Sequence, residues 1–232
     1  MSRRVAKLPP AGPGPVVQER ALRLLLVAIQ AFDRARLRAL TACHPGLEID
    51  PTASTNLAAA RYELAPGARL RIGAGVVGER MPGALHISLG PDAQVEIEER
   101  TWLRTEIAPI RIFAFEGARL HIGPDSFLNG CHLSAKRELR LGRRVFVGPG
   151  SRIFDADQHD LDAERSERVE PVVIGDHVWI AADVIVLRGV SIGEHSVIGA
   201  RSLVTEDLEP HSLAFGQPAR RRGDVGDRSR TR

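Results

Sequence analysis

An aliphatic residue recurs at every sixth position between residues 172 and 208, and this period constrains the fold more than any other feature. The series runs Ile174, Ile180, Val186, Ile192, Ile198 and Val204, and each member has a small or β-branched residue two positions before it. A helix would place residues six apart on nearly opposite faces, and a half-buried strand would simply alternate every two residues. The period therefore predicts a solenoid, in which each hexad forms one side of a coil and stacked coils share an apolar axis.

Weaker copies of the same pattern precede this run. Segments that begin at Gly67, Asp92 and Gly117 align at a spacing of 25 residues, and a fourth copy follows 19 residues later at Lys136. Three hexads make one coil of about 18 residues, so these spacings correspond to whole coils that carry short loops. We therefore expect roughly seven coils between residues 66 and 209.

Glycines punctuate these copies. Gly73, Gly123 and Gly142 directly follow apolar pairs, which predicts tight corners with positive φ. The segment 73–78 also matches the dinucleotide-binding fingerprint, but that fingerprint requires a helix to open at its third glycine. Pro82 lies too close behind to allow such a helix, so we interpret these glycines as coil corners.

The chain divides into four predicted parts. Prolines and glycines indicate an irregular arm over 1–16, and helical spacing of apolar residues predicts a helical segment within 17–50. The parallel β-helix is expected over 51–218, followed by a basic and disordered tail over 219–232. The helix should pack on the solenoid end, which otherwise exposes a sheet edge, although an apolar stripe could instead bind a membrane surface.

Charge and composition limit the classes of partner. The chain has 232 residues and a formal net charge of +3. Residues 1–7 carry +3 and residues 219–232 carry +4, so the segment between them has a net negative charge. Aromatic residues make up only 4%, which leaves few stacking platforms for single-stranded nucleic acid. We expect no nucleic-acid partner and no transmembrane segment, and the apolar core of a secretory signal is missing at the N-terminus. Two cysteines, Cys43 and Cys131, suit a reduced cytoplasmic setting.

One interruption of the hexads stands apart. Leu141, Val147 and Ile153 keep the six-residue step, and the pattern then stops until Val172. The inserted segment is polar and acidic and contains His159. Loops on rigid scaffolds are where binding and catalytic residues concentrate, so this insertion is the candidate position for chemistry.

Several motifs now stand in a fixed order: Phe127-Leu-Asn129-Gly, Asp155-x-Asp157-x-His159, Ile174-Gly-Asp-His-Val-Trp179-Ile, Ile192-Gly-Glu-His-Ser-Val-Ile-Gly-Ala200, Val204-Thr205 and Gly216-Gln-Pro218-Ala-Arg220. Together they resemble the hexapeptide-repeat acyltransferases, in the branch of the maltose, galactoside and surface-polysaccharide O-acetyltransferases. The resemblance covers about residues 66–222 and is strongest after Gly123.

The resemblance implies a left-handed parallel β-helix that assembles as a homotrimer. It also implies transfer of an acetyl group from acetyl-CoA, bound between subunits, to a hydroxyl of a sugar or a surface-polysaccharide precursor. His159 matches the family's general base, a role that suits an imidazole titrating near neutrality. The family's histidine usually precedes a proline, whereas Asp160 follows here.

Two further residues complete the predicted catalytic set. Asp155 or Asp157 could orient the imidazole of His159, as could a backbone carbonyl, and we favour Asp157. Asn129 matches the family asparagine beside the thioester, where an amide N–H would stabilise the developing oxyanion. The alternative for Asn129 is a stacked asparagine in a coil corner.

The remaining matches fall along the groove that the family uses for coenzyme A. They are Trp179, Ala182, Ala200, Arg201, Thr205 and Arg220. Taken alone, Trp179 could be a packing residue and Arg220 part of the basic tail. Arg201 replaces a small residue of the family, so it either binds a phosphate or narrows the groove.

Other functions remain open on the same scaffold. An amino sugar or serine could be the acceptor, and a non-catalytic scaffold is conceivable. The γ-type carbonic anhydrases share this helix and hold a metal through three histidines, two of them five residues apart. No pair of the eight histidines here has that spacing, so we expect no metal.

Overall fold

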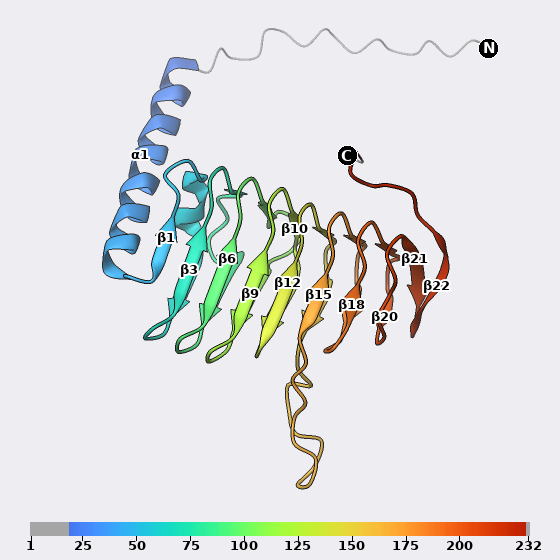
Figure 1. Ribbon diagram of the computed structural model, residues 1–232. Coiled ribbons are helices and arrows are strands. Elements are labelled where there is room, and N and C mark those ends of the chain that lie inside the picture. Colours follow the sequence, from blue (N-terminus) through green and yellow to red (C-terminus); the bar gives the residue numbers. More distant parts are fainter. Residues whose placement is uncertain (1–18, 231–232) are drawn as a thin grey trace, which may run out of the picture.

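The computed structural model describes residues 19–230, so the predicted arm at 1–16 lies outside the described residues. The chain winds into stacked triangular coils whose sides form three sheets, with one long helix at the first coil (Figure 1). Within each sheet, the strands of successive coils pair in parallel, an arrangement typical of a left-handed β-helix. The predicted fold class, mainly β with an N-terminal helix, is confirmed.

We number the sheets in the order in which a coil visits them. Sheet 1 contains β1 (Leu47–Ile49), β3 (Arg69–Ile72), β6 (Gln94–Ile97), β9 (Arg119–Ile122), β12 (Glu138–Leu141), β15 (Val172–Ile174) and β18 (Ser191–Ile192). Sheet 2 contains β4 (Val77–Gly78), β7 (Trp102–Arg104), β10 (Phe127–Asn129), β13 (Phe146–Val147), β16 (Trp179–Ile180), β19 (Val197–Ile198), β21 (Ser212–Gly216) and β22 (Ala219–Asp224). Sheet 3 contains β2 (Arg61–Leu64), β5 (Leu85–Leu89), β8 (Ile110–Ala114), β11 (His132–Ala135), β14 (Arg152–Phe154), β17 (Ile185–Val186) and β20 (Leu203–Val204).

The six-residue period arises because each hexad forms one side of a coil, and two of its residues, such as Val178 and Ile180, point to the common axis. On sheet 1, Ile72, Ile97 and Ile122 pair in register, and each is at most 1% exposed. The residue between two buried positions points outward, so each strand reads exposed–buried in alternation. The core is therefore a stack of aliphatic columns that runs the length of the solenoid.

The corners differ from the expectation of positive φ at Gly73, Gly123 and Gly142. Positive φ occurs two residues later, at Gly75 (64°), Asp125 (58°) and Arg144 (54°). The earlier glycines are required for another reason, since a Cβ on Gly123 would lie 2.5 Å from the carbonyl oxygen of Gly142. These glycines therefore allow neighbouring coils to approach closely.

Helix α1 (Glu19–Cys43) packs only its C-terminal half on the solenoid. It contacts η1 (Thr55–Ala59) and β1, with Leu37 buried against them. The carboxylate of Asp33, 2% exposed, accepts a hydrogen bond from Arg80 Nε at 2.7 Å. Within the described range, no helix is long and apolar enough to cross a membrane.

Both ends of the solenoid extend beyond the expected limits. At the first coil, β1 pairs with β3 before residue 51, where the β-helix was expected to begin. At the last coil, β22 pairs antiparallel with β21, so residues 219–224 are part of sheet 2. The expectation of disorder over 219–232 is wrong for these residues, because β22 satisfies the open edge of the last coil.

Candidate functional site

A groove of about 930 Å³ runs along the outer face of sheet 2. Four aromatic side chains from consecutive coils form its floor: Trp102, Phe127, Phe146 and Trp179. They pair in register between neighbouring strands, because each directly precedes an inward-facing aliphatic residue and so points outward. The rings of Trp102 and Phe127 meet edge to face with centroids 5.1 Å apart, an arrangement that aromatic pairs prefer.

Part of this aromatic surface faces solvent. Trp102 and Trp179 are each 44% exposed, although apolar rings of that size are favourably removed from water. A concave wall of exposed aromatic rings with few polar groups is the usual composition of a site for a small ligand.

Asn129 supplies a polar group at one border of the groove. It ends β10, pairs in register with Arg104 of β7, and is 7% exposed. Its buried Oδ1 has no hydrogen-bond partner among the described residues. An unpaired buried acceptor costs about 1–3 kcal/mol, so this carboxamide is positioned to bind a ligand.

The C-terminal segment reaches the opposite border. The guanidinium of Arg228 lies 5.6 Å from the ring centroid of Trp179, and its Nε donates to the carbonyl oxygen of His177 at 3.1 Å. Its backbone N–H donates to Nδ1 of His195 at 2.9 Å. Arg228 therefore places a positive charge in the groove, and residues 225–230 lie along the corner between sheets 1 and 2.

Three imidazoles stack at this corner. The rings of His177, His195 and His211 are 4.8 Å and 4.9 Å apart along successive coils. Burial lowers the pKa of His177 below its ordinary value, and the neighbouring His195 and Arg144 act in the same direction. The hydrogen bond between Nδ1 of His195 and the backbone N–H of Arg228 joins this stack to the C-terminal segment.

The insertion that carries His159 leaves the solenoid elsewhere. It connects β14 of sheet 3 to β15 of sheet 1 and extends away from the coils below β15 (Figure 1). The carboxylate of Asp155 anchors its start, since it accepts the backbone N–H groups of Lys136, Arg137 and Glu138 at 2.7–2.8 Å. Burial raises the pKa of Asp155, and the three donors oppose that shift.

Asp157 holds this loop to the solenoid. Its Oδ1 accepts from Arg188 Nε at 2.6 Å, and this pair lowers the pKa of Asp157. Arg188 also contacts Glu170 at 2.9 Å. The carboxylate of Asp157 is thus held by Arg188 in this structure, and its role in orienting the imidazole of His159 stays a prediction.

The structure separates the predicted catalytic residues within one chain. His159 is exposed and does not line the groove, whereas Asn129 does. The two residues lie at different corners, since Asn129 is between sheets 2 and 3 and the His159 loop is between sheets 3 and 1.

The predicted cofactor residues divide in the same way. Trp179 and Ala182 line the groove beside Asn129. The other four lie outside its lining on the last coils and are exposed: Ala200, Arg201, Thr205 and Arg220. Arg220 forms an ion pair with Glu206 at 3.1 Å, and the guanidinium of Arg201, 83% exposed, lies 3.9 Å from Asp183.

Sequence reasoning missed several groove residues. Trp102, Phe127 and Phe146 share one position in their coils, directly before a buried aliphatic residue. An alignment of the coils by that position would have revealed the aromatic row. No pattern in the sequence pointed to Arg228, because it lies in the segment that was expected to be a disordered tail.

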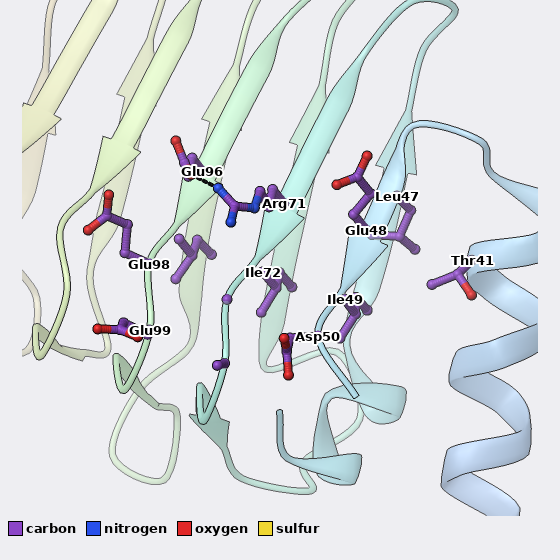
Figure 2. Close-up of a pocket in the computed structure, with 13 residues that line it drawn as sticks. Thr41, Leu47, Glu48, Ile49, Asp50, Arg71, Ile72, Glu96, Glu98 and Glu99 are labelled. Atoms are coloured by element: carbon purple, nitrogen blue, oxygen red, sulfur yellow. Dashed lines mark hydrogen bonds and ion pairs between the residues drawn. The ribbon is translucent and has the colours of Figure 1, made fainter. Parts of the chain in front are cut away.

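A second depression, about 720 Å³, lies between α1 and the first coils of sheet 1 (Figure 2). Acidic residues dominate its border, and Arg71 pairs with Glu96 there. Nearby, Glu96, Glu98 and His121 form one possible cation-binding group in the described part of the chain. Since Arg71 pairs with Glu96, and His121 contacts Glu98 at 3.1 Å, we assign this cluster to side-chain pairing along the sheet.

Comparisons with known proteins agree with this architecture. Residues 171–206 match the bacterial transferase hexapeptide family (six repeats). The galactoside O-acetyltransferase of Escherichia coli is 30% identical over 138 residues, which cover 58% of this chain and 66% of that enzyme. The chain spans 56% to 66% of the lengths of this enzyme, a galactoside O-acetyltransferase of Lactococcus lactis and a putative acetyltransferase of Schizosaccharomyces pombe.

Solved structures that superpose with TM-scores of 0.57 and 0.59 show the same fold. A polysialic acid O-acetyltransferase superposes with a TM-score of 0.59 and 18% identity over 79% of this chain and 87% of that chain. A galactoside acetyltransferase in complex with coenzyme A is 28% identical over 62% of this chain and 66% of that chain, with a TM-score of 0.49.

Proposed function

Because this chain belongs to the hexapeptide-repeat acetyltransferase family, we propose that it transfers an acetyl group from acetyl-CoA to a hydroxyl of a sugar or a surface-polysaccharide precursor. The galactoside O-acetyltransferase among its relatives supports both the reaction and the acceptor class. The observation that carries the proposal is the buried, unpaired Oδ1 of Asn129 at the border of an aromatic groove.

The reaction assigns separate tasks to the chain's residues. His159 removes the proton of the acceptor hydroxyl as its oxygen attacks the thioester carbonyl carbon. The new C–O bond forms, the C–S bond breaks, and the imidazolium returns its proton to the departing thiolate. The carboxamide of Asn129 can present either its oxygen or its N–H to a bound ligand, and the N–H would stabilise negative charge on the carbonyl oxygen.

The groove supports a long and partly apolar donor such as acetyl-CoA. Trp179 and Ala182 form the wall beside Asn129, and the cationic Arg228 lies at its other border. The other matched residues lie on later coils: Ala200 and Arg201 between β19 and β20, Thr205 directly after β20, and Arg220 on β22. The two arginines would meet phosphate groups there. We retain these six residues and Arg228 as the proposed donor site.

The site requires a second subunit, since His159 and Asn129 lie at different corners of one chain. In a homotrimer with cyclic symmetry, the loop of one subunit can reach the groove of its neighbour. We therefore propose that each active site combines His159 from one subunit with Asn129 from the next.

An assay of free thiol tests the reaction. The purified protein is incubated with acetyl-CoA and with galactosides, maltose, sialic acid polymers, amino sugars or serine. We expect thiol release with a hydroxyl-bearing glycan, and a loss of at least 100-fold in kcat for His159→Ala. The matched control His121→Ala, on sheet 1, should keep its activity. Release only with amines would replace O-acetylation by N-acetylation, and no release with any acceptor would contradict the proposal.

Subunit mixing tests the shared site. His159→Ala and Asn129→Ala are each expected to be inactive alone, whereas co-expression should restore part of the activity, because some interfaces then combine two intact residues. Light scattering should give a mass three times 25.3 kDa. If mixed assemblies remain inactive, both residues act within one subunit and the proposed assembly is wrong.

A further inference from the structure

Helix α1 carries two apolar stripes, and the described structure covers only the C-terminal part of one of them, since Leu22 and Leu26 are each 49% exposed. The inner stripe includes Leu37 and Leu40, which pack against the core near the buried Asp33. Figure 1 shows that the N-terminal half of α1 extends past the coils. The covered stripe accounts for the position of the helix but leaves its other face without a partner in the described structure.

The outer stripe lies on the opposite side of the helix. It consists of Leu24, Leu25, Ala28, Phe32, Ala35 and Ala39. From Leu25 onward its members are spaced three and four residues apart, so they share one helical face. Leu24, Leu25 and Phe32 are 70%, 56% and 63% exposed. Large apolar side chains gathered in one patch on a surface mark an interaction site.

Positive charge borders this stripe. Arg34, Arg36 and Arg38 are exposed, and at 100° per residue Arg36 lies on one side of the stripe while Arg34 and Arg38 lie on the other. None of the three forms an ion pair with the described residues. The acid within residues 22–43, Asp33, is buried and bound to Arg80, so it does not offset this charge.

We propose that α1 docks through its outer stripe onto an anionic membrane surface. An apolar face bordered by arginines matches the interface, where rings and aliphatic chains enter the acyl boundary and guanidinium groups meet lipid phosphates. Pairing of α1 with a second copy would bring like charges together, because both copies would present the same arginines. The inference is independent of the proposed transferase activity.

Vesicle sedimentation with the full-length protein tests the docking. Vesicles of phosphatidylcholine alone are compared with vesicles that contain one third phosphatidylglycerol. We expect binding only to the anionic vesicles, with weaker binding at high salt. Phe32→Glu should weaken binding at least tenfold, whereas Ile107→Glu should change it less than twofold. Ile107 is a matched control because it is 60% exposed outside α1 and the charge change is the same.

Two triple Arg→Gln variants distinguish attraction by the arginines of α1 from attraction by the net charge of the chain. The triple variant of Arg34, Arg36 and Arg38 to Gln should lose most of its binding to anionic vesicles. The control triple variant changes Arg137, Arg140 and Arg143 to Gln, which are exposed near sheet 1, and should retain it. Equal losses in both triple variants would overturn the proposal, because the attraction would then arise from net charge alone.

Light scattering tests the competing occupant. The mass of the assembly should be the same for the wild-type chain and for Phe32→Glu. A smaller assembly for Phe32→Glu, together with no binding of the wild-type chain to anionic vesicles, would show that a second copy covers the stripe and would overturn membrane docking.

Discussion

Gly123 lies where two adjacent coils approach each other so closely that no side chain fits. A Cβ there would lie 2.5 Å from the carbonyl oxygen of Gly142, which belongs to the next coil and cannot move alone. We expect Gly123→Ala to lower the free energy of unfolding by about 1–3 kcal/mol. Urea unfolding measures this, with Gly226→Ala as a control because nothing lies within 4 Å of its added Cβ. Equal stability of the two variants would show that the coils can separate.

His132 gives the fold a dependence on pH. Burial lowers its pKa below the ordinary value of 6.5, and Arg111 and Arg152 act in the same direction from neighbouring strands. As pH falls below about 6.5, the unfolded chain therefore binds the proton first, so stability falls until the folded pKa is passed. In His132→Phe this contribution should vanish, and the ring still fits between Phe113 and Phe154. Melting temperatures between pH 7.5 and 5 for both proteins measure the difference; parallel curves would contradict it.

At the scale of elements, the inserted loop depends on Arg188. This side chain, 19% exposed, bridges Asp157 of the loop and Glu170 near its end. We expect Arg188→Ala to release the loop, so that trypsin cleaves at Arg165 or Arg168 several-fold faster while the melting temperature changes little. Arg61→Ala, which removes an arginine from an exposed ion pair, serves as the control. Unchanged cleavage would mean that the anchor at Asp155 suffices.

The sequence allowed some elements to be predicted better than others. The strands from β15 to β20 could be predicted from the hexads, because these coils are short and have no inserted loops to interrupt the six-residue period. β1 and η1 were missed, since the first coil lacks that period. The loop of His159 was found as a break in the pattern, but its pairing through Arg188 depends on a residue 31 positions away from Asp157, which no local pattern reveals.

For the whole molecule, the last coil would leave an unpaired strand edge if β22 did not cover it. It covers the edge of β21 by antiparallel pairing and buries Ala219. A chain that ends at Pro218 should expose this edge, melt at a lower temperature and aggregate on heating, as unpaired edge strands do. Dynamic light scattering during a thermal ramp measures this, with a chain that ends at Arg230 as the control. Equal aggregation onsets would show that β22 is dispensable.

The alignment of buried columns across coils of unequal length has a further consequence. Ile97 and Ile122 are 25 residues apart in the chain, whereas Ile174 and Ile192 are 18 residues apart. Both pairs are nevertheless in register on neighbouring strands of sheet 1. Extra residues are thus absorbed at the corners and within longer sheet 3 strands such as β5 and β8. Insertions at these places can therefore reshape the borders of the solenoid, while the wall of sheet 2 keeps its geometry.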